Sequence, residues 1–272
     1  ESIKNQGFNV FLLFYYNQVL QVSATGSAIA LAIALIVDAV TDPVAGSLSD
    51  KLHSRWGRRH PFILFSAVPL AISFYLLFNP PVGLSELSYV IWLAVLAILV
   101  RSSLTFYHVP HLALGAEMAR DYDQRSTMYA FSTFFGFMGG VVFIPISYRV
   151  FFPTTEAFNP GLLNQSAYSS WAIFAGVTMI FAVLVCVVGT RHEIPRLRRT
   201  QNIYVDRFTM FRMLGEVREV FKNHSFFVLF FGMVLSVFIL SIEAVFNPFM
   251  GFHFWEMTTE QLAYIPLGMF AG

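Results

Sequence analysis

Two aspartates stand within a long apolar stretch, where ionised groups are costly. Asp38 and Asp42 interrupt residues 27–49, which otherwise hold mostly aliphatic and small side chains. A spacing of four places both carboxylates on one side of a helix. Two carboxylates this close cannot both stay ionised in a low-dielectric site without a cation, a proton or a basic partner. The pair therefore predicts a site for Na⁺ or H⁺, and the alternative is a structural ion pair with a neighbouring helix.

A second polar set lies in the apolar residues 89–114. Arg101, Thr105 and His108 are separated by four and three positions, so they form one stripe along a helix. Pro110 follows and frees a backbone carbonyl one turn earlier. Kinked helices beside buried polar groups are typical of binding sites in membrane proteins. We predict that Arg101 and His108 bind a substrate; the alternative for His108 is an interior histidine bonded to a neighbouring helix.

Two more ionisable residues lie in or beside apolar stretches. Lys4 precedes residues 7–22, and Glu243 lies late in residues 226–246. Ionisable groups in such positions are expensive and indicate functional sites. We expect either residue to line a central cavity. Lys4 is predicted to bind the substrate and could pair with Asp38; the alternative is that truncation of the first helix makes Lys4 look more buried than it is.

The segment after the aspartates combines a tight turn with charges of both signs. A glycine at its start allows neighbouring helices to approach closely. Asp50 is expected to pair with Arg58 or with a basic residue at the end of residues 89–114. We predict a gate at the inner end of the helices, and the alternative is a solvated basic loop. The predicted gate residues are Gly46, Asp50, Arg55, Gly57, Arg58 and Arg59.

The composition places these residues in a lipid bilayer. Of the 272 residues, 56% are hydrophobic and 12% are charged, whereas a soluble domain carries about 25% charged residues. The net charge of +1 gives no sign of a nucleic-acid partner, and the single Cys186 excludes an internal disulfide framework. Because no serine-centred elbow and no His-Glu zinc motif occurs, we expect neither an enzyme nor a cofactor.

The apolar residues lie in blocks, each close to the ~20 residues that cross a ~30 Å hydrocarbon layer. Strands of a membrane barrel would be about half as long and would alternate polar with apolar residues. We therefore predict an all-α membrane protein. The chain is expected to be a fragment, because it begins inside one helix and ends inside another. The predicted spans are residues 7–22, 27–49, 62–78, 89–114, 128–148, 171–189 and 226–246, with an eighth beginning near Gln261.

The basic residues assign the two sides of the membrane. Every Lys and Arg except Lys4, Arg101 and Arg149 lies in the loops that follow the second, fourth and sixth spans. Because basic residues favour the cytoplasmic side, these loops and the N-terminus are predicted to be cytoplasmic.

The longest basic loop predicts two bundles of helices. Residues 205–222 within it show helix-like apolar spacing and are expected to form an amphipathic helix at the membrane surface. We expect an N-terminal bundle over residues 1–189 whose first helix is incomplete, a cytoplasmic basic linker over 190–225, and the start of a second bundle over 226–272.

Several short stretches resemble one family of membrane proteins. They are Asp-Ala-Val-Thr-Asp-Pro at 38–43, Gly46, and Ser-Arg-Trp-Gly-Arg-Arg-His-Pro at 54–61. These are similar to the glycoside-pentoside-hexuronide:cation symporters of the major facilitator superfamily, and the resemblance covers essentially the whole chain. It implies a twelve-helix fold and sugar transport driven by Na⁺, H⁺ or Li⁺, and we expect a monomer. It also implies that Asp38, Asp42 and Thr105 form the cation site, and their hard oxygen atoms suit a small hard cation.

The chain departs from this family at positions that contact sugar. His108 replaces an aspartate on the fourth helix, Ser2 an aspartate on the first, and Thr133 or a neighbour an arginine on the fifth. The sequence His-Val-Pro at 108–110 is similar to that of sodium-dependent lysophospholipid symporters. We therefore expect Na⁺- or H⁺-coupled symport of a sugar or glycoside across a bacterial inner membrane. The alternatives are symport of a lysophospholipid or another amphiphile, and a membrane receptor without transport.

Overall fold

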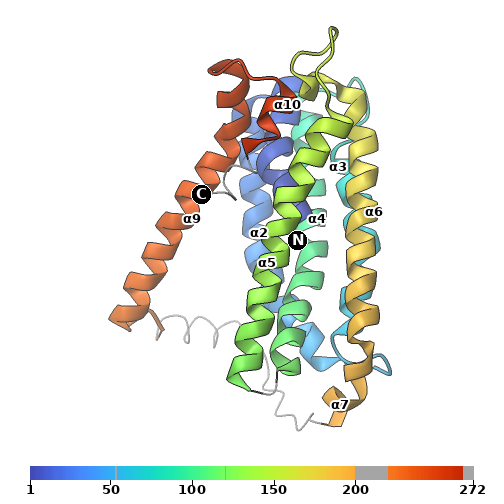
Figure 1. Ribbon diagram of the computed structural model, residues 1–272, viewed down its shortest axis with the longest axis vertical. Helices are drawn as coiled ribbons and strands as arrows, with labels where there is room; N and C mark the ends of the chain where they lie inside the picture. The colour runs from blue at the N-terminus through green and yellow to red at the C-terminus, as the bar shows by residue number, and fades with distance from the viewer. Residues whose placement is uncertain (53, 120, 200–219, 266–272) are drawn as a thin grey trace.

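The computed structural model describes residues 1–272 except 53, 120, 200–219 and 266–272 (Figure 1). The described residues form helices and loops and contain no strand, as predicted. The helices of the first part are α1 Ser2–Gln6, η1 Gly7–Leu12, η2 Tyr15–Val19, α2 Ala24–Lys51, α3 His60–Leu77 and α4 Glu86–Met118. They are followed by α5 Tyr122–Ile146, η3 Ser147–Phe151, η4 Gly161–Leu163, α6 Gln165–Thr190, η5 Arg191–Glu193, α7 Ile194–Arg199, α9 His224–His253 and α10 Thr259–Leu262.

Six segments of the described chain are long and apolar enough to cross a membrane. They contain α2, α3, α4, α5, α6 and α9, so the second to seventh predicted spans are confirmed. Several helices begin earlier than the apolar residues suggest because a polar side chain caps them. Ser85 accepts a hydrogen bond from the backbone N–H of Ser88 at the start of α4, and Asp121 does the same for Gln124 at the start of α5.

The first predicted span, residues 7–22, is helical but not one regular helix. Its backbone passes from α1 into two π-helical segments, η1 and η2, and the chain turns at Gln21, which has a φ of 58°. π-helical turns are rare and often occur at functional sites. Aromatic packing holds this segment in the bundle. Phe11 lies 4.6 Å from Trp171, centroid to centroid, and the Tyr16 hydroxyl donates to the carbonyl of Leu77 at 2.9 Å.

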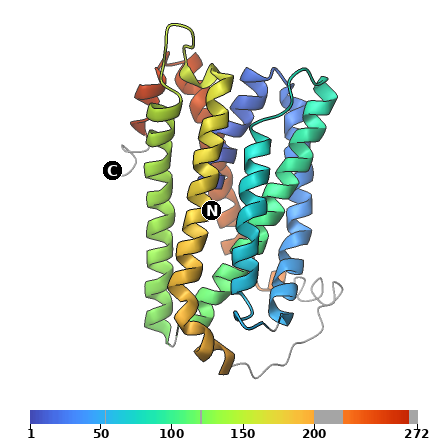
Figure 2. The same cartoon turned by 90° about the vertical axis from the view of Figure 1, so that its right-hand side faces the viewer.

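The helices α2 to α6 stand side by side and alternate in direction (Figures 1 and 2). The described parts of the loops 52–59 and 119–121 lie at the same end as α7, and we call this the basic end. Helix α9 meets the other helices at the opposite end and leans away from them toward the basic end (Figure 1). Phe14 of the first segment packs there against Phe249 and Phe252 of α9. The amphipathic helix predicted for residues 205–222 lies almost wholly outside the described residues.

Candidate functional site

Helices α2 and α4 pack along each other and bring the predicted cation ligands together. The Thr105 hydroxyl of α4 lies 2.8 Å from Oδ1 of Asp42 and 3.1 Å from Oδ1 of Asp38. Thr105 is 4% exposed, and Asp38 is half-buried. The spacing of four in α2 therefore points both carboxylates at one hydroxyl.

This arrangement has more acceptors than protons. A threonine hydroxyl carries a single proton, so it donates fully to only one of the two carboxylates at a time. The hydroxyl oxygen of Thr105 and the carboxylate oxygen that receives no proton then repel each other, unless a proton or a cation lies between them. Three hard oxygen atoms at these distances are a suitable set for a proton or a small hard cation.

Arg101 lies one turn from Thr105 on α4 and neutralises one of the two aspartates. Its guanidinium Nη1 donates to Oδ2 of Asp38 at 2.8 Å, and the side chains of the pair are 18% and 23% exposed. The predicted alternative, an ion pair with a neighbouring helix, is thus present for Asp38. Asp42 forms no ion pair with any described residue. The two aspartates therefore differ in their partners, because Arg101 pairs with Asp38 and not with Asp42.

The other predicted substrate residues lie on the same side of α4 as this cluster. Lys4 is only 6% exposed, and its ammonium lies 5.3 Å from the centroid of the Phe8 ring. It forms no ion pair with Asp38 within the described residues. His108 Nδ1 lies 2.8 Å from a carboxylate oxygen of Glu1, the residue before α1, but this nitrogen forms no hydrogen bond of normal geometry within the described residues.

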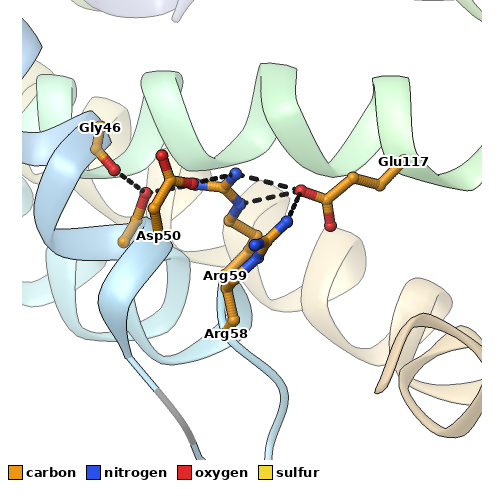
Figure 3. A network of polar contacts seen from close by, with 6 residues as sticks. Gly46, Asp50, Arg58, Arg59 and Glu117 are labelled. Atoms are coloured by element: carbon orange, nitrogen blue, oxygen red, sulfur yellow. Dashed lines mark hydrogen bonds and ion pairs between the residues drawn. The ribbon is translucent and has the colours of Figure 1, made fainter. Parts of the chain in front are cut away.

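At the basic end, charged side chains join α2, α3 and α4 (Figure 3). Arg59 is central to this network and its side chain is 8% exposed. It pairs with Asp50 of α2 at 2.5 Å and with Glu117 of α4 at 3.0 Å. Its Nη1 also donates to the hydroxyl of Ser49 at 2.5 Å, and Ser49 in turn donates to the carbonyl of Gly46.

This network differs from the predicted one in its partners. Asp50 pairs with Arg59, whereas Arg58 pairs with Glu117 at 2.5 Å. Glu117 at the end of α4 is a further member of this network, and it was not predicted. An acidic residue directly before a basic loop was a signal that could have identified it. Arg55 is exposed and forms no ion pair within the described residues.

The two predicted gate glycines have different roles. Gly57 has a φ of +83°, a conformation that other residues rarely adopt, and it turns the chain between α2 and α3. A Cβ on Gly46 would lie 3.6 Å from Val109, which is ordinary contact with α4.

At the opposite end, a set of hydrogen bonds that was not predicted joins residues 152–161 to α10. The carboxylate of Glu260 accepts from the backbone N–H of Thr154 at 2.6 Å. The hydroxyl of Thr259 accepts from the backbone N–H of Gly161 at 2.9 Å, and the backbone N–H of Thr259 donates to the hydroxyl of Thr154 at 3.2 Å. We call these contacts, at the end of the bundle opposite the basic end, the outer clasp. No sequence pattern signals them, because they join residues about a hundred positions apart.

Helices long and apolar enough to span a membrane, carboxylates within one of them and a charged network at one end are features of a multi-pass membrane protein. The chain belongs to the family described as MFS/sugar transport protein, whose sequence profile matches residues 2–272. Its relatives place it with the glycoside-pentoside-hexuronide:cation symporters.

Curated relatives are similar over much of the chain. The Uncharacterized symporter YnaJ of Bacillus subtilis is 27% identical over 83% of this chain and 47% of the relative. The Glucuronide carrier protein homolog of Escherichia coli is 24% identical over 87% of this chain and 49% of the relative. The Sodium-dependent lysophosphatidylcholine symporter 1 of Gallus gallus is 26% identical over 72% of this chain and 35% of the relative. The chain thus spans about half the length of the first two of these relatives.

Proposed function

We propose that the protein is a secondary active transporter that couples the entry of Na⁺ or H⁺ to the symport of a sugar or glycoside. The observation that carries this proposal is the position of the Thr105 hydroxyl between Asp38 and Asp42. Its one proton leaves a second carboxylate contact unsatisfied, and a bound cation or proton satisfies it. The family and the names of the relatives support the sugar as cargo.

In this proposal Asp42 is the residue whose charge the coupling ion neutralises. Asp38 is held in place by Arg101 and contributes its second oxygen atom to the site. Binding of the ion stabilises the contact between α2 and α4. The substrate binds beside this contact, next to the first helical segment formed by α1, η1 and η2. Coupling requires that each ligand strengthens the binding of the other by the same free energy.

We further propose that the membrane is a bacterial inner membrane, that the basic end is cytoplasmic, and that the protein acts as a monomer. The basic loops support this orientation. Residues 1–189 would form the first bundle, 190–225 the linker and 226–272 the start of the second bundle. The charged network at the basic end would then be part of the inner gate.

A lysophospholipid or another amphiphile is the second candidate cargo. It is favoured by the similarity to a lysophosphatidylcholine symporter and by the sequence His-Val-Pro at 108–110. A receptor without transport would bind the cation and the ligand but would show no flux.

The test uses the full-length protein in proteoliposomes. Uptake of a panel of labelled sugars and glycosides is measured with a Na⁺ gradient, with a H⁺ gradient and with neither. We expect one gradient to drive accumulation of at least one sugar, and unlabelled sugar inside to accelerate entry of the label, as a carrier requires. Uptake of a labelled lysophospholipid and of no sugar would favour the second candidate. Binding without any flux would favour a receptor.

A further inference from the structure

A cavity of about 400 Å³ lies between α1, α5 and α9, away from the α2–α4 contact. This volume falls within the ~300–1,000 Å³ that is typical of small-molecule sites. Its polar wall includes Gln6 of α1 and Glu243 and Asn247 of α9, while Phe137 of α5 and Tyr148 of η3 supply aromatic surface. Amides that both donate and accept, a carboxylate that accepts and flat apolar surface together suit a ring that carries many hydroxyl groups.

Helix α1 separates this cavity from the cation cluster by presenting two different faces. Lys4 is buried toward Phe8, whereas Ser2 and Gln6 face α5. The Ser2 hydroxyl donates to the carbonyl of Gly136 at 2.7 Å. A Cβ on Gly140 would lie 2.8 Å from the amide nitrogen of Gln6, so the absence of a side chain on α5 makes room for this amide.

Glu243 and Asn247 are four residues apart on α9, so they project from one face of the helix toward the cavity. Glu243 forms no ion pair with any described residue, although it lies in a membrane-spanning helix. A carboxylate in that position is costly and indicates a functional site. Hydroxyl donors of a bound sugar would satisfy its oxygen atoms.

We propose that Gln6, Glu243 and Asn247 form a subsite that binds hydroxyl groups of the transported sugar. Glu243 accepts hydrogen bonds from the sugar, and the two amides donate to and accept from its other hydroxyl groups. This inference rests on the proposed function and extends it by naming residues that determine which sugars bind. It also gives α9, beyond the predicted linker, direct contact with the cargo.

The test uses the sugar that the full-length protein transports best and its singly deoxygenated analogues. In the wild-type protein, the analogue that lacks the hydroxyl bound by Glu243 should show an apparent KM raised by roughly 10-fold or more. In Glu243→Gln the apparent KM for the parent sugar should rise by a similar factor. The apparent KM for the same analogue should then be little higher than that for the parent sugar, because the interaction that both changes remove is already absent. The deciding quantity is the ratio of the KM values for the analogue and the parent sugar within one variant, and impaired folding cannot mimic a change in that ratio.

Two further variants and a control complete the experiment. Asn247→Leu and Gln6→Leu should each raise the apparent KM for the parent sugar, while the half-saturating cation concentration at saturating sugar stays unchanged. Glu156→Gln is the matched control, because Glu156 is exposed in the loop 152–160. Full discrimination among deoxy analogues in Glu243→Gln would overturn the subsite and leave the proposed function intact.

The proposed transport function can be wrong while the sugar subsite is correct. If no gradient drives sugar uptake, binding of the same sugars to the purified protein is measured by equilibrium dialysis. Sugar binding that weakens in Glu243→Gln would still support the subsite. Absence of sugar binding to the wild-type protein would overturn it.

Discussion

Arg59 donates two hydrogen bonds to the same oxygen atom of Glu117, one from Nε at 3.2 Å and one from Nη2 at 3.0 Å. The same oxygen atom accepts a third hydrogen bond from Arg58 at 2.5 Å. One carboxylate thus compensates two guanidinium groups where α3 begins and α4 ends. The contact ties three helices together at the basic end, because Arg59 also reaches Asp50 of α2.

Glu117→Gln is expected to destabilise the basic end of the bundle. It removes the negative charge shared by Arg58 and Arg59, whose side chains are only 19% and 8% exposed. Leaving charged groups short of partners costs about 1–3 kcal/mol. The melting temperature of the purified protein should therefore fall by several degrees. Glu256→Gln, at an exposed position, is the control, and equal melting temperatures for both variants would contradict the role of Glu117.

Asp42→Asn and Asp38→Asn should separate coupling from stability. Asp42 has no ion pair among the described residues, so Asp42→Asn should abolish gradient-driven uptake and leave the melting temperature nearly unchanged. Asp38→Asn deprives Arg101 of its charge partner and should also cost about 1–3 kcal/mol of stability. Asp123→Asn, exposed in the first turn of α5, is the control. Gradient-driven uptake by Asp42→Asn at the wild-type rate would contradict the proposed cation site.

Thr105 is expected to act through its oxygen atom. Thr105→Val keeps the shape of the side chain but removes the atom that lies within 3.1 Å of both carboxylates. We expect the cation concentration for half-maximal uptake to rise about 10-fold or more, as loss of one hydrogen-bonded ligand implies. Thr105→Ser retains the hydroxyl and should stay within a few fold of the wild type. Equal behaviour of the two variants would show that the oxygen atom is unimportant.

Gly161→Ala should disturb the outer clasp. A Cβ at this position would overlap the carbonyl oxygen of Phe152, so the backbone around Gly161 would have to move. The hydrogen bond from Gly161 to Thr259 would be lost with that movement. Gly189→Ala is the matched control, because a Cβ there meets nothing within 4 Å and alanine favours a helix. Thermal unfolding should show a lower melting temperature for the first variant only.

The outer clasp is also expected to weaken in acid. Burial alone would raise the pKa of Glu260, but hydrogen bonds from Thr154 and Thr258 hold the pKa below its ordinary value. A carboxylate with a lowered folded-state pKa contributes its full stabilisation above the unfolded pKa of about 4.3 and loses it as the pH falls through the folded pKa. Melting temperatures of the wild type and Glu260→Gln should therefore differ at pH 7 and converge in acid. A difference that persists below both pKa values would contradict this assignment.

The sequence by itself determined the spans, the side of α2 that carries both aspartates and the stripe on α4. Each follows from a local pattern. A span is marked by a run of about twenty apolar residues, and a helix face by polar residues spaced three to four positions apart. Only the tertiary structure decided which groups meet. Arg101 pairs with Asp38 and not with Asp42, Asp50 pairs with Arg59 and not with Arg58, and Glu260 reaches Thr154. These contacts depend on how helices distant in sequence pack against one another, and the period of a single helix carries no information about its neighbour.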